Sequence, residues 1–424
     1  MLEITTIRQN PEAVIARLKV KYVENAAEMV AQILQYDAQR RSLQQQRDDL
    51  LNRSNTLAQE IGQLYKQGKR PEADALKAET LSLKESIKQA EADFASIDEQ
   101  LNQTLVQLPN LPHELVPEGA TPEENFEIRR GGTIPALHDK AQPHWDLVQK
   151  YRLIDFETGA KITGSGFPLF VGRGAKLQRA LINFFLDRAT EAGYTEYIPP
   201  HVVNHASAYA TGQLPDKEAQ MYHVTLDDLY LIPTAEVPLT NIYRDVILPE
   251  SELPIRLTGY TPCFRREAGA AGKDTRGLNR LHQFDKVEIV QVQHPEHSYA
   301  ALDEMVVHVE QILQSLQLPY RIIRLCGGDM SFASAMTYDF EVYSAAQQKW
   351  LEVSSVSNFE TFQANRLQLR YRDANKKNRL AHTLNGSALA LPRIMAALLE
   401  NNQTPDGIVV PDVLCPYTGF SMID

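Results

Sequence analysis

The sequence is poor in the residues that mark several common classes of protein. Its three cysteines, Cys263, Cys326 and Cys415, lie far apart and form no Cys-x-x-Cys pair, so neither a disulfide framework nor a cysteine zinc site is supported. Positive charge is also scarce, because 43 Lys and Arg stand against 54 Asp and Glu, a net charge of −11. Any contact with nucleic acid must therefore depend on local basic patches, since phosphates bind the charges within their reach.

Long apolar runs are missing as well. No stretch is long enough to cross a bilayer, and the first ten residues lack the apolar core of a signal peptide. Together with the isolated thiols, this predicts a cytoplasmic protein without a membrane segment. The 424 residues and ordinary apolar content predict two or three globular domains.

Proline is absent between Pro11 and Pro71, and apolar residues there follow a seven-residue period. The period is interrupted around Gly68 and then resumes, which predicts an antiparallel hairpin of two long helices. Arms of some 40 residues would reach about 60 Å at 1.5 Å per residue. The apolar positions are Met29, Tyr36, Leu43, Leu50, Leu57 and Leu64 before the turn, and Leu76, Leu83, Ala90 and Ile97 after it.

Two functions are compatible with this helical arm. Periodicity alone favours a dimerisation or scaffold coiled coil. However, Arg40, Arg47 and Ser54 fall where apolar residues are expected, and the arm carries basic side chains that suit a phosphate backbone. The basic side chains in question are Arg40, Arg41, Arg47, Arg53, Lys66, Lys69, Arg70 and Lys77.

The proline-rich residues 111–130 are expected to be a linker. Residues 1–110 then form the arm and residues 131–424 form a second domain. This boundary separates the heptad pattern from a body of mixed helix and strand signals.

The second domain contains two extended segments that flank a glycine-containing loop between residues 257 and 290, which predicts a long β-hairpin. Alternation puts Arg265 and Glu267 on one face of the first strand. It also puts Arg280, Phe284 and Glu288 on one face of the second strand. Val287 and Ile289 lie on the opposite face and are expected to pack against helices. A solvated polar face is the simpler interpretation, but guanidinium, carboxylate and aromatic groups together suit a nucleotide.

The hairpin residues from Phe264 to Glu288 resemble motif 2 of class II aminoacyl-tRNA synthetases, and within that class they resemble seryl-tRNA synthetases. The helix expected at 175–192 and the strand expected at 197–200 resemble motif 1, which forms the dimer interface in that class. Residues 383–393 resemble motif 3, with Ala388 and Pro392 at positions where glycine is usual. Proline is compatible with a first helical turn, so altered packing rather than lost catalysis is expected.

The resemblance implies an α+β fold. The long antiparallel coiled-coil hairpin would be followed by a class II catalytic domain, with a mixed, mainly antiparallel sheet flanked by helices. In that family the arm grips the long variable arm of the tRNA, and the enzyme is a homodimer.

The resemblance also implies an ATP site, in which Arg265 and Arg393 are the catalytic residues. Arg265 would bind the α-phosphate and the serine carboxylate, and Arg280 would bind the β- and γ-phosphates. Phe284 and Arg393 would cover the two faces of adenine, with Arg393 also reaching the γ-phosphate, and Glu267 would accept from the adenine amino group. The remaining ATP contacts are Arg266, Glu352, Val353, Ser354 and Ser355.

Glu352 and Ser355 are the implied Mg²⁺ contacts. Their spacing of three residues does not keep them on one strand face, so a β-bulge or a water-mediated contact is expected. The implied serine site combines carboxylates for the ammonium group with hydrogen-bonding groups for the rest of the amino acid. It comprises Thr234, Ala235, Glu236, Arg265, Glu288, Asn385 and Ser387.

The implied reaction joins serine to ATP as seryl-adenylate and then transfers the seryl group to a terminal ribose hydroxyl of tRNA(Ser), or of tRNA(Sec) where a cell makes one. One rival is a related ligase that loads an amino acid onto a carrier protein, but such homologues lack the long arm. The other rival is a tRNA-binding or scaffold protein without catalysis. It would have little reason to keep Arg265, Glu267, Arg280, Glu288 and Arg393 together.

Overall fold

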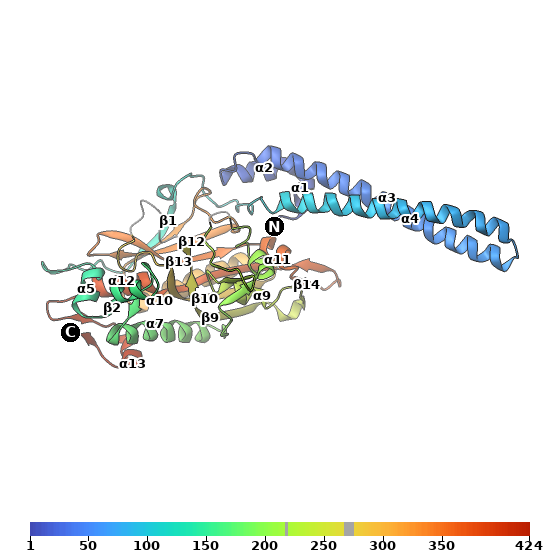
Figure 1. Cartoon of the computed structure of the whole chain (residues 1–424). Coiled ribbons are helices and arrows are strands. Elements are labelled where there is room, and N and C mark those ends of the chain that lie inside the picture. The colour runs from blue at the N-terminus through green and yellow to red at the C-terminus, as the bar shows by residue number, and fades with distance from the viewer. Residues whose placement is uncertain (217–218, 267–274) are drawn as a thin grey trace. The chain divides into compact units, whose positions relative to one another are not determined.

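The computed structural model describes residues 1–216, 219–266 and 275–424, which divide into two compact units (Figure 1). The first unit comprises Met1–Lys19 and Val23–Pro109. The second comprises Val20–Tyr22 and Asn110–Asp424.

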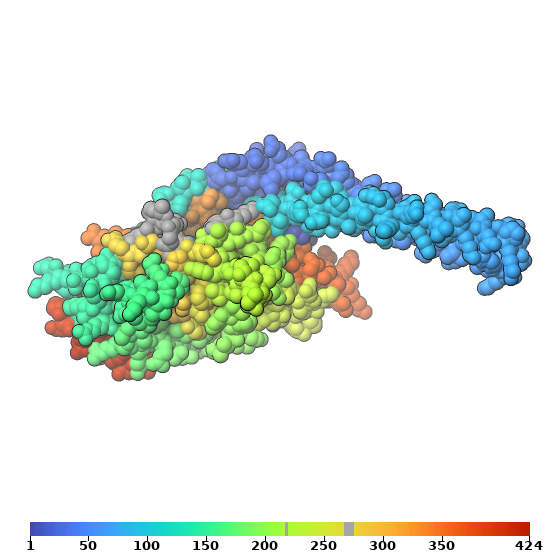
Figure 2. Space-filling model, viewed as in Figure 1, coloured from blue at the N-terminus to red at the C-terminus, as the bar shows by residue number. Residues whose placement is uncertain are grey.

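The first unit is built around two long antiparallel helices, α3 (Ala26–Lys66) and α4 (Arg70–Leu105), which confirms the predicted hairpin. Figure 2 shows the two helices side by side. Two short helices precede them, α1 (Ile4–Gln9) and α2 (Pro11–Val20). The Oδ1 atom of Asn10 accepts a hydrogen bond from the Ala13 N–H at 3.2 Å. Asn10 therefore caps the N-terminus of α2, and Pro11 occupies its first turn.

The seam between α3 and α4 contains the predicted apolar residues, with Leu57, Ala90 and Ile97 buried. The polar interruptions are accommodated in two ways. The guanidinium of Arg47 lies 4.8 Å from the centre of the Phe94 ring. Arg40 reaches Asp98 of the other helix at 3.6 Å. Long side chains can cover apolar surface while their charge stays paired, so these arginines do not break the seam.

Asp37 on α3 is completely buried and joins the short α1 to the hairpin. Arg8 of α1 donates to both carboxylate oxygens, from Nε at 2.8 Å and from Nη2 at 2.9 Å. Arg40 and Arg41 add ion pairs at 3.5 and 3.1 Å. Burial alone would raise the pKa of Asp37, but the three guanidinium groups outweigh it and hold that pKa below its usual range.

The second unit contains a sheet of eight strands in the order β1-β11-β12-β13-β16-β10-β9-β4. Every neighbouring pair is antiparallel except β4 and β9, so the sheet is mixed and mainly antiparallel, as predicted. The strands are β1 (Phe126–Gly131), β4 (Thr195–Glu196), β9 (Ile255–Phe264), β10 (Gln283–Gln293), β11 (Tyr320–Arg324), β12 (Met336–Ser344), β13 (Lys349–Asn358) and β16 (His382–Ala390).

The helices that pack on this sheet include α7 (Gly172–Glu191), α10 (Ser298–Ser315) and α12 (Leu391–Asn401). Val287 and Ile289 of β10 are fully buried in the core that these helices share. The prediction that one face of the hairpin packs against helices is therefore confirmed. The other face of β10 carries Phe284, Lys286 and Glu288.

The sequence-based boundaries differ from the structure in two places. Residues 111–130, expected as a linker, belong to the second unit and include most of β1, which pairs with β11. The strand expected at residues 197–200 is wrong, because β4 ends at Glu196. Pro199 and Pro200 have no N–H to donate to a neighbouring strand.

Smaller elements complete the second unit. Its other helices are α5 (His144–Lys150), α6 (Phe156–Ile162), α8 (His205–Ala210), α9 (Glu236–Asn241), α11 (Thr361–Leu367) and α13 (Cys415–Thr418). Two small sheets have two strands each, β2 (Ile154–Asp155) with β3 (Leu169–Phe170), and β17 (Ile408–Val409) with β18 (Met422–Ile423). Two others have three strands each. One contains β5 (Val202–Asn204), β6 (His223–Val224) and β7 (Leu229–Leu231), and the other contains β8 (Ile247–Pro249), β14 (Arg370–Arg372) and β15 (Asn378–Leu380). Among the described residues, no helix has the length and apolarity needed to span a membrane.

Replacing Asp37 with Asn should loosen α1 from the hairpin and cost about 1–3 kcal/mol in free energy of unfolding. Because the pKa of Asp37 is depressed in the folded state, its contribution is complete above the unfolded pKa near 4 and is lost as pH falls through the folded pKa. Chemical denaturation at pH 7 and pH 3 checks this. Asp49→Asn on the exposed side of α3 is the control, and an equal loss at both pH values would contradict the assignment.

Candidate active site

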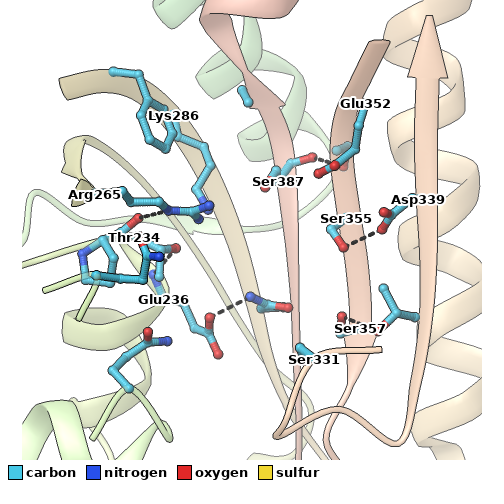
Figure 3. A pocket seen from close by; sticks show the side chains of 18 of the residues that line it. Thr234, Glu236, Arg265, Lys286, Ser331, Asp339, Glu352, Ser355, Ser357 and Ser387 are labelled. Carbon is cyan, nitrogen blue, oxygen red and sulfur yellow. Dashed lines mark hydrogen bonds between the residues drawn. The ribbon is translucent and has the colours of Figure 1, made fainter. Parts of the chain in front are cut away.

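A cavity of about 680 Å³ opens on the face of the sheet that carries Phe284 and Lys286. Its walls come from segments far apart in the sequence. Thr234, Glu236, Arg265 and Lys286 lie on one side, and Asp339, Glu352 and Ser355 lie on the other (Figure 3). Ser387 of β16 lies between them (Figure 3), and Asn385 of the same strand also lines the cavity. The predicted residues of motifs 2 and 3 therefore meet in one place.

Glu236, the first residue of α9, places its carboxylate in the first of these walls. Its Oε1 accepts from Gln363 Nε2 at 2.6 Å, and its Oε2 accepts from Asn385 Nδ2 at 2.8 Å. Both donors are neutral amides, and the side chain is buried. Burial, assisted by the nearby charge of Glu288, raises the pKa of Glu236 to about 7. The group would readily accept a cationic partner.

Glu288 lies one layer behind the cavity wall and is fully buried. Lys286 Nζ lies 2.7 Å from its Oε2, which also accepts from Thr234 Oγ1 at 3.2 Å. Its Oε1 accepts from Asn385 Nδ2 at 3.2 Å. Burial raises the pKa of Glu288, and Lys286 opposes that shift. Because its oxygens already have partners, Glu288 supports Thr234 and Asn385 rather than reaching the cavity itself.

Two residues of this wall were missed by the sequence analysis. Lys286 lines the cavity, and alternation with Phe284 and Glu288 could have found it. Gln363 on α11 is buried and connects Glu236 to Thr383, whose Oγ1 donates to Gln363 Oε1 at 2.7 Å. Nothing in the local sequence distinguishes Gln363 from a surface glutamine, because only tertiary contacts place it there.

The cations predicted for ATP also line the cavity, but strand alternation is not what places them there. β9 ends at Phe264, so Arg265 lies just beyond it, with Nε 3.3 Å from the Pro233 carbonyl oxygen and the guanidinium 5.3 Å from the centre of the Phe284 ring. Arg280 precedes β10 in an irregular segment. Arg393, in the first turn of α12, donates from Nη1 to the Glu352 carbonyl oxygen at 2.8 Å.

Besides Glu288, two predicted site residues do not line this cavity, and a third lies outside the described residues. Arg266 donates to the Met221 carbonyl oxygen at 3.1 Å, and its guanidinium lies 4.6 Å from the Tyr222 ring centre. Ala235 is fully buried beside Thr234 and Glu236. Glu267, predicted to accept from adenine, lies outside the described residues.

The opposite wall contains a β-bulge, as the spacing of Glu352 and Ser355 predicted. Phe340 of β12 pairs with Ser354 and Glu341 pairs with Glu352, so Val353 is the extra residue. The bulge brings both predicted metal contacts to the cavity. Val353 and Ser354 line it as well.

Asp339 was missed and lies across from Ser355, whose Oγ donates to its Oδ1 at 2.5 Å. Burial, and next the charge of Glu352, raises the pKa of Asp339 well above its usual range. Repulsion between these carboxylates would be relieved by a divalent cation, and carboxylate and hydroxyl oxygens are donors that Mg²⁺ accepts. No cluster of three or more His, Cys, Asp or Glu that could hold a metal occurs within residues 1–216, 219–266 and 275–424. A cation here would need ligands from a substrate or from water.

Motif 3 runs from β16 directly into α12, and both departures from the expected glycines are accommodated. Ala388 is fully buried within β16. Pro392 lies in the first turn of α12, as predicted, and lines the cavity.

The cavity lining thus combines the Glu236 carboxylate, the three arginines Arg265, Arg280 and Arg393, and an acidic pair, Asp339 and Glu352, beside a bulge. Such an arrangement can hold an ammonium group next to a polyphosphate. The described residues of its lining include no Ser or Cys paired with a histidine base, so the site suits a reaction driven by positioning and charge stabilisation.

Comparison with known proteins gives one consistent result. The family model described as tRNA synthetase class II core domain (G, H, P, S and T) matches residues 222–402. The one described as seryl-tRNA synthetase N-terminal domain matches residues 1–112. Serine–tRNA ligase of Salinibacter ruber is 51% identical, covering 100% of this chain and 99% of its own. That of Synechococcus elongatus is 46% identical with the same coverage.

Solved structures agree with these matches. A seryl-tRNA synthetase from Pyrococcus horikoshii complexed with ATP superposes with a TM-score of 0.92 at 36% identity, covering 100% of this chain and 99% of its own. A cytoplasmic serine–tRNA ligase from Naegleria fowleri in complex with AMP gives a TM-score of 0.88 at 26% identity, with the same coverage.

Proposed function

The chain belongs to the seryl-tRNA synthetase family of class II synthetases, and from that premise we propose that it activates L-serine with ATP and transfers the seryl group to tRNA(Ser). We extend the proposal to tRNA(Sec) in a cell that makes one. The observation that carries it is the distribution of charge in one cavity. The carboxylate of Glu236 lines this cavity together with the guanidinium groups of Arg265, Arg280 and Arg393, which would bind a triphosphate.

In the first step, a serine carboxylate oxygen attacks the α-phosphorus of ATP. The bond between the α-phosphorus and the bridging oxygen breaks, and pyrophosphate leaves with the electron pair. The carboxylate is already ionised, so no general base is needed. Arg265 binds the serine carboxylate and the α-phosphate and stabilises the charge that develops between them. Arg280 and Arg393 bind the β- and γ-phosphates, and Phe284 and Arg393 cover the faces of adenine.

Mg²⁺ fits the acidic wall, where Glu352 and Ser355 would hold it with phosphate oxygens and water as the other ligands. When bound, it neutralises phosphate charge and supports the departure of pyrophosphate. Asp339 orients the Ser355 hydroxyl through its 2.5 Å hydrogen bond and adds negative charge to the same wall. A cation bound at this wall would favour the ionised form of Asp339, whose pKa burial and the charge of Glu352 raise.

Serine selectivity follows from the other wall. Glu236 binds the ammonium group, and Thr234, Asn385 and Ser387 offer hydrogen bonds to the carboxylate and hydroxyl. A pocket that pairs the serine hydroxyl would reject alanine by about 10⁴-fold, because buried partners would be left unsatisfied. Glu288 contributes by holding Thr234 and Asn385 in place at 3.2 Å each.

The arm supplies the tRNA contact in this proposal. Its arginines already have partners, since Arg53 pairs with Glu79 at 2.9 Å and Arg41 pairs with Asp37 at 3.1 Å. At the tip, Lys66, Lys69 and Arg70 are exposed, and Lys69 has a longer ion pair with Glu72 at 3.8 Å, so these side chains are the better candidates for phosphates. The presence of this arm also separates the chain from the carrier-protein ligases that lack one.

Dimerisation through motif 1 is part of the proposal. Ile198, which follows β4, is 89% exposed in the single chain, and Tyr197 and Val202 nearby are partly exposed. Covering this apolar group with a second copy would remove it from water. Cys263, Cys326 and Cys415 are free thiols, which supports a reducing cytoplasm as the site of the reaction.

The first test is exchange of labelled pyrophosphate into ATP, run without tRNA across all twenty amino acids. Serine alone should support exchange in the wild type. Glu236→Gln should lower serine-dependent exchange at least 100-fold while ATP binding by calorimetry changes little, because the ammonium loses its counter-charge. Folded protein that gave no exchange with any amino acid would favour the scaffold alternative.

Serine affinity should depend on pH through Glu236. Its pKa of about 7 in the free protein falls when an ammonium group binds, so at lower pH a proton must first leave. The dissociation constant of serine should rise by up to about tenfold per pH unit below pH 7. Calorimetry in two buffers of different ionisation enthalpy should detect release of a proton at pH 6. In Glu236→Gln this release should disappear, and a wild type that releases no proton would contradict the role.

Substituting Lys66 and Lys69 with Gln should weaken tRNA(Ser) binding and flatten its dependence on salt, by about 0.7–0.9 in logarithmic slope for each phosphate that the arm no longer neutralises. Lys376→Gln with Lys377→Gln, on an exposed turn of the second unit, changes the charge equally and serves as the control. Filter binding at several salt concentrations measures both. Unchanged affinity and slope in the tip variant would reject the arm as the tRNA contact.

A further inference from the structure

A completely buried pair, His144 and Glu400, lies outside the cavity and plays no part in the chemistry described above. Glu400 is on α12, and His144 is the first residue of α5. The Glu400 carboxylate accepts from the His144 backbone N–H at 2.8 Å, from His144 Nδ1 at 2.6 Å and from Gln347 Nε2 at 2.8 Å. The Ser344 hydroxyl donates to its other oxygen. So many donors fix the carboxylate in one orientation.

The imidazole of His144 has a defined tautomer. The backbone N–H of Leu278 donates to Nε2 at 2.8 Å, and an amide nitrogen can only donate. Nε2 therefore carries no proton, and the proton on Nδ1 points to Glu400. The ring thus transmits the position of Glu400 to the backbone at Leu278.

Residues 277 and 278, which precede β10, contact this ring directly. Gly277 has φ of +58°, and a Cβ atom added there would lie 2.3 Å from His144 Nε2, so a larger residue would not fit. Next to it, the guanidinium of Arg276 lies 4.4 Å from the centre of the Trp145 ring. Asn279 Nδ2 donates to Gln347 Oε1 at 3.2 Å. Residues 276–279 are thereby fixed by contacts with His144, Trp145 and Gln347.

The same segment is bound a second time by α12. Arg393 Nε donates to the Asn279 carbonyl oxygen at 3.1 Å. Arg393 and Glu400 are seven residues apart, so they lie on one face of the helix. Helix α12 therefore contacts residues 278 and 279 at two points, directly through Arg393 and through His144 from Glu400. Arg280, which lines the cavity, is the next residue along the chain.

We propose that His144 and Glu400 are positioning residues for the ATP site, which fix residues 278–280 so that Arg280 and Arg393 converge on the triphosphate. The inference rests on the proposed function, because it assumes that these arginines bind ATP. The hydrogen bonds that build this network run through α12, α5 and residues 278–279, away from the wall that holds Glu236 and Asn385. Disturbing it should therefore weaken the use of ATP and leave the use of serine unchanged.

Two substitutions of His144 separate this role from simple core filling. Asn can keep the donor toward Glu400 but has no acceptor for Leu278, whereas Gln can place its amide oxygen where Nε2 accepts. In pyrophosphate exchange, His144→Asn should raise the KM for ATP about tenfold, the equivalent of removing one hydrogen bond, with the serine KM unchanged within about twofold. His144→Gln should recover part of the loss, because it restores the acceptor for Leu278 but not the donor toward Glu400. A similar rise in both KM values, or Gln as impaired as Asn, would overturn the proposal.

Gln347→Ala is the second variant, since Gln347 lies in the turn between β12 and β13 and its loss should not prevent folding. It should raise the ATP KM in the same direction by about threefold, and an unchanged value would count against the network. ATP dissociation constants from calorimetry are measured in parallel. A wild type that bound ATP without serine-dependent exchange would reject the proposed function, whereas normal ATP affinity in His144→Asn would reject only this inference.

Discussion

Two carboxylates that share one amide donor inside a folded core are the constraint on which this site depends. Asn385 Nδ2 donates to both Glu236 and Glu288, at 2.8 and 3.2 Å. Burial, and next the charge of the neighbouring Glu288, disfavours the ionised form of Glu236 and raises its pKa to about 7. Lys286 compensates one carboxylate at 2.7 Å and leaves the other with neutral donors. The wall is thus prepared for one more positive charge.

The pairing of β10 with β16 makes this arrangement possible. Glu288 lies opposite Ser387, and Asn385 is two residues further along the same face of β16. On the far wall, the bulge at Val353 turns Glu352 and Ser355 toward the same space. The far wall therefore carries the acidic side chains Asp339 and Glu352, whereas on the near wall Lys286 pairs with Glu288. The arginines that line the cavity come from chain segments just outside the strands, from which their long side chains reach it.

In the first unit, a narrow apolar seam holds together a long helical hairpin that is otherwise polar. Arg47 lies on Phe94, and Arg53 forms an ion pair with Glu79 of the facing helix. Asp37 is buried under Arg8, Arg40 and Arg41 at the end where the short helices join. Charge pairing therefore supplements apolar contact along the hairpin. The basic side chains of the tip, Lys66, Lys69 and Arg70, are also exposed.

Local sequence was enough to predict the helical hairpin and the hairpin of β9 and β10, because each follows from a local period of seven or two. The helix after motif 3 and the pairing of Glu352 with Ser355 came from the family resemblance, and the structure selects the bulge over the water-mediated contact. Local sequence could not reveal that Gln363, Asp339 and His144 support the site, or that Glu288 stands behind the wall while Glu236 faces the cavity. Those roles depend on which distant segments meet, and a buried polar side chain has the same local sequence as an exposed one. Folding the whole chain settles which carboxylate is desolvated, which is already paired and which still needs a partner.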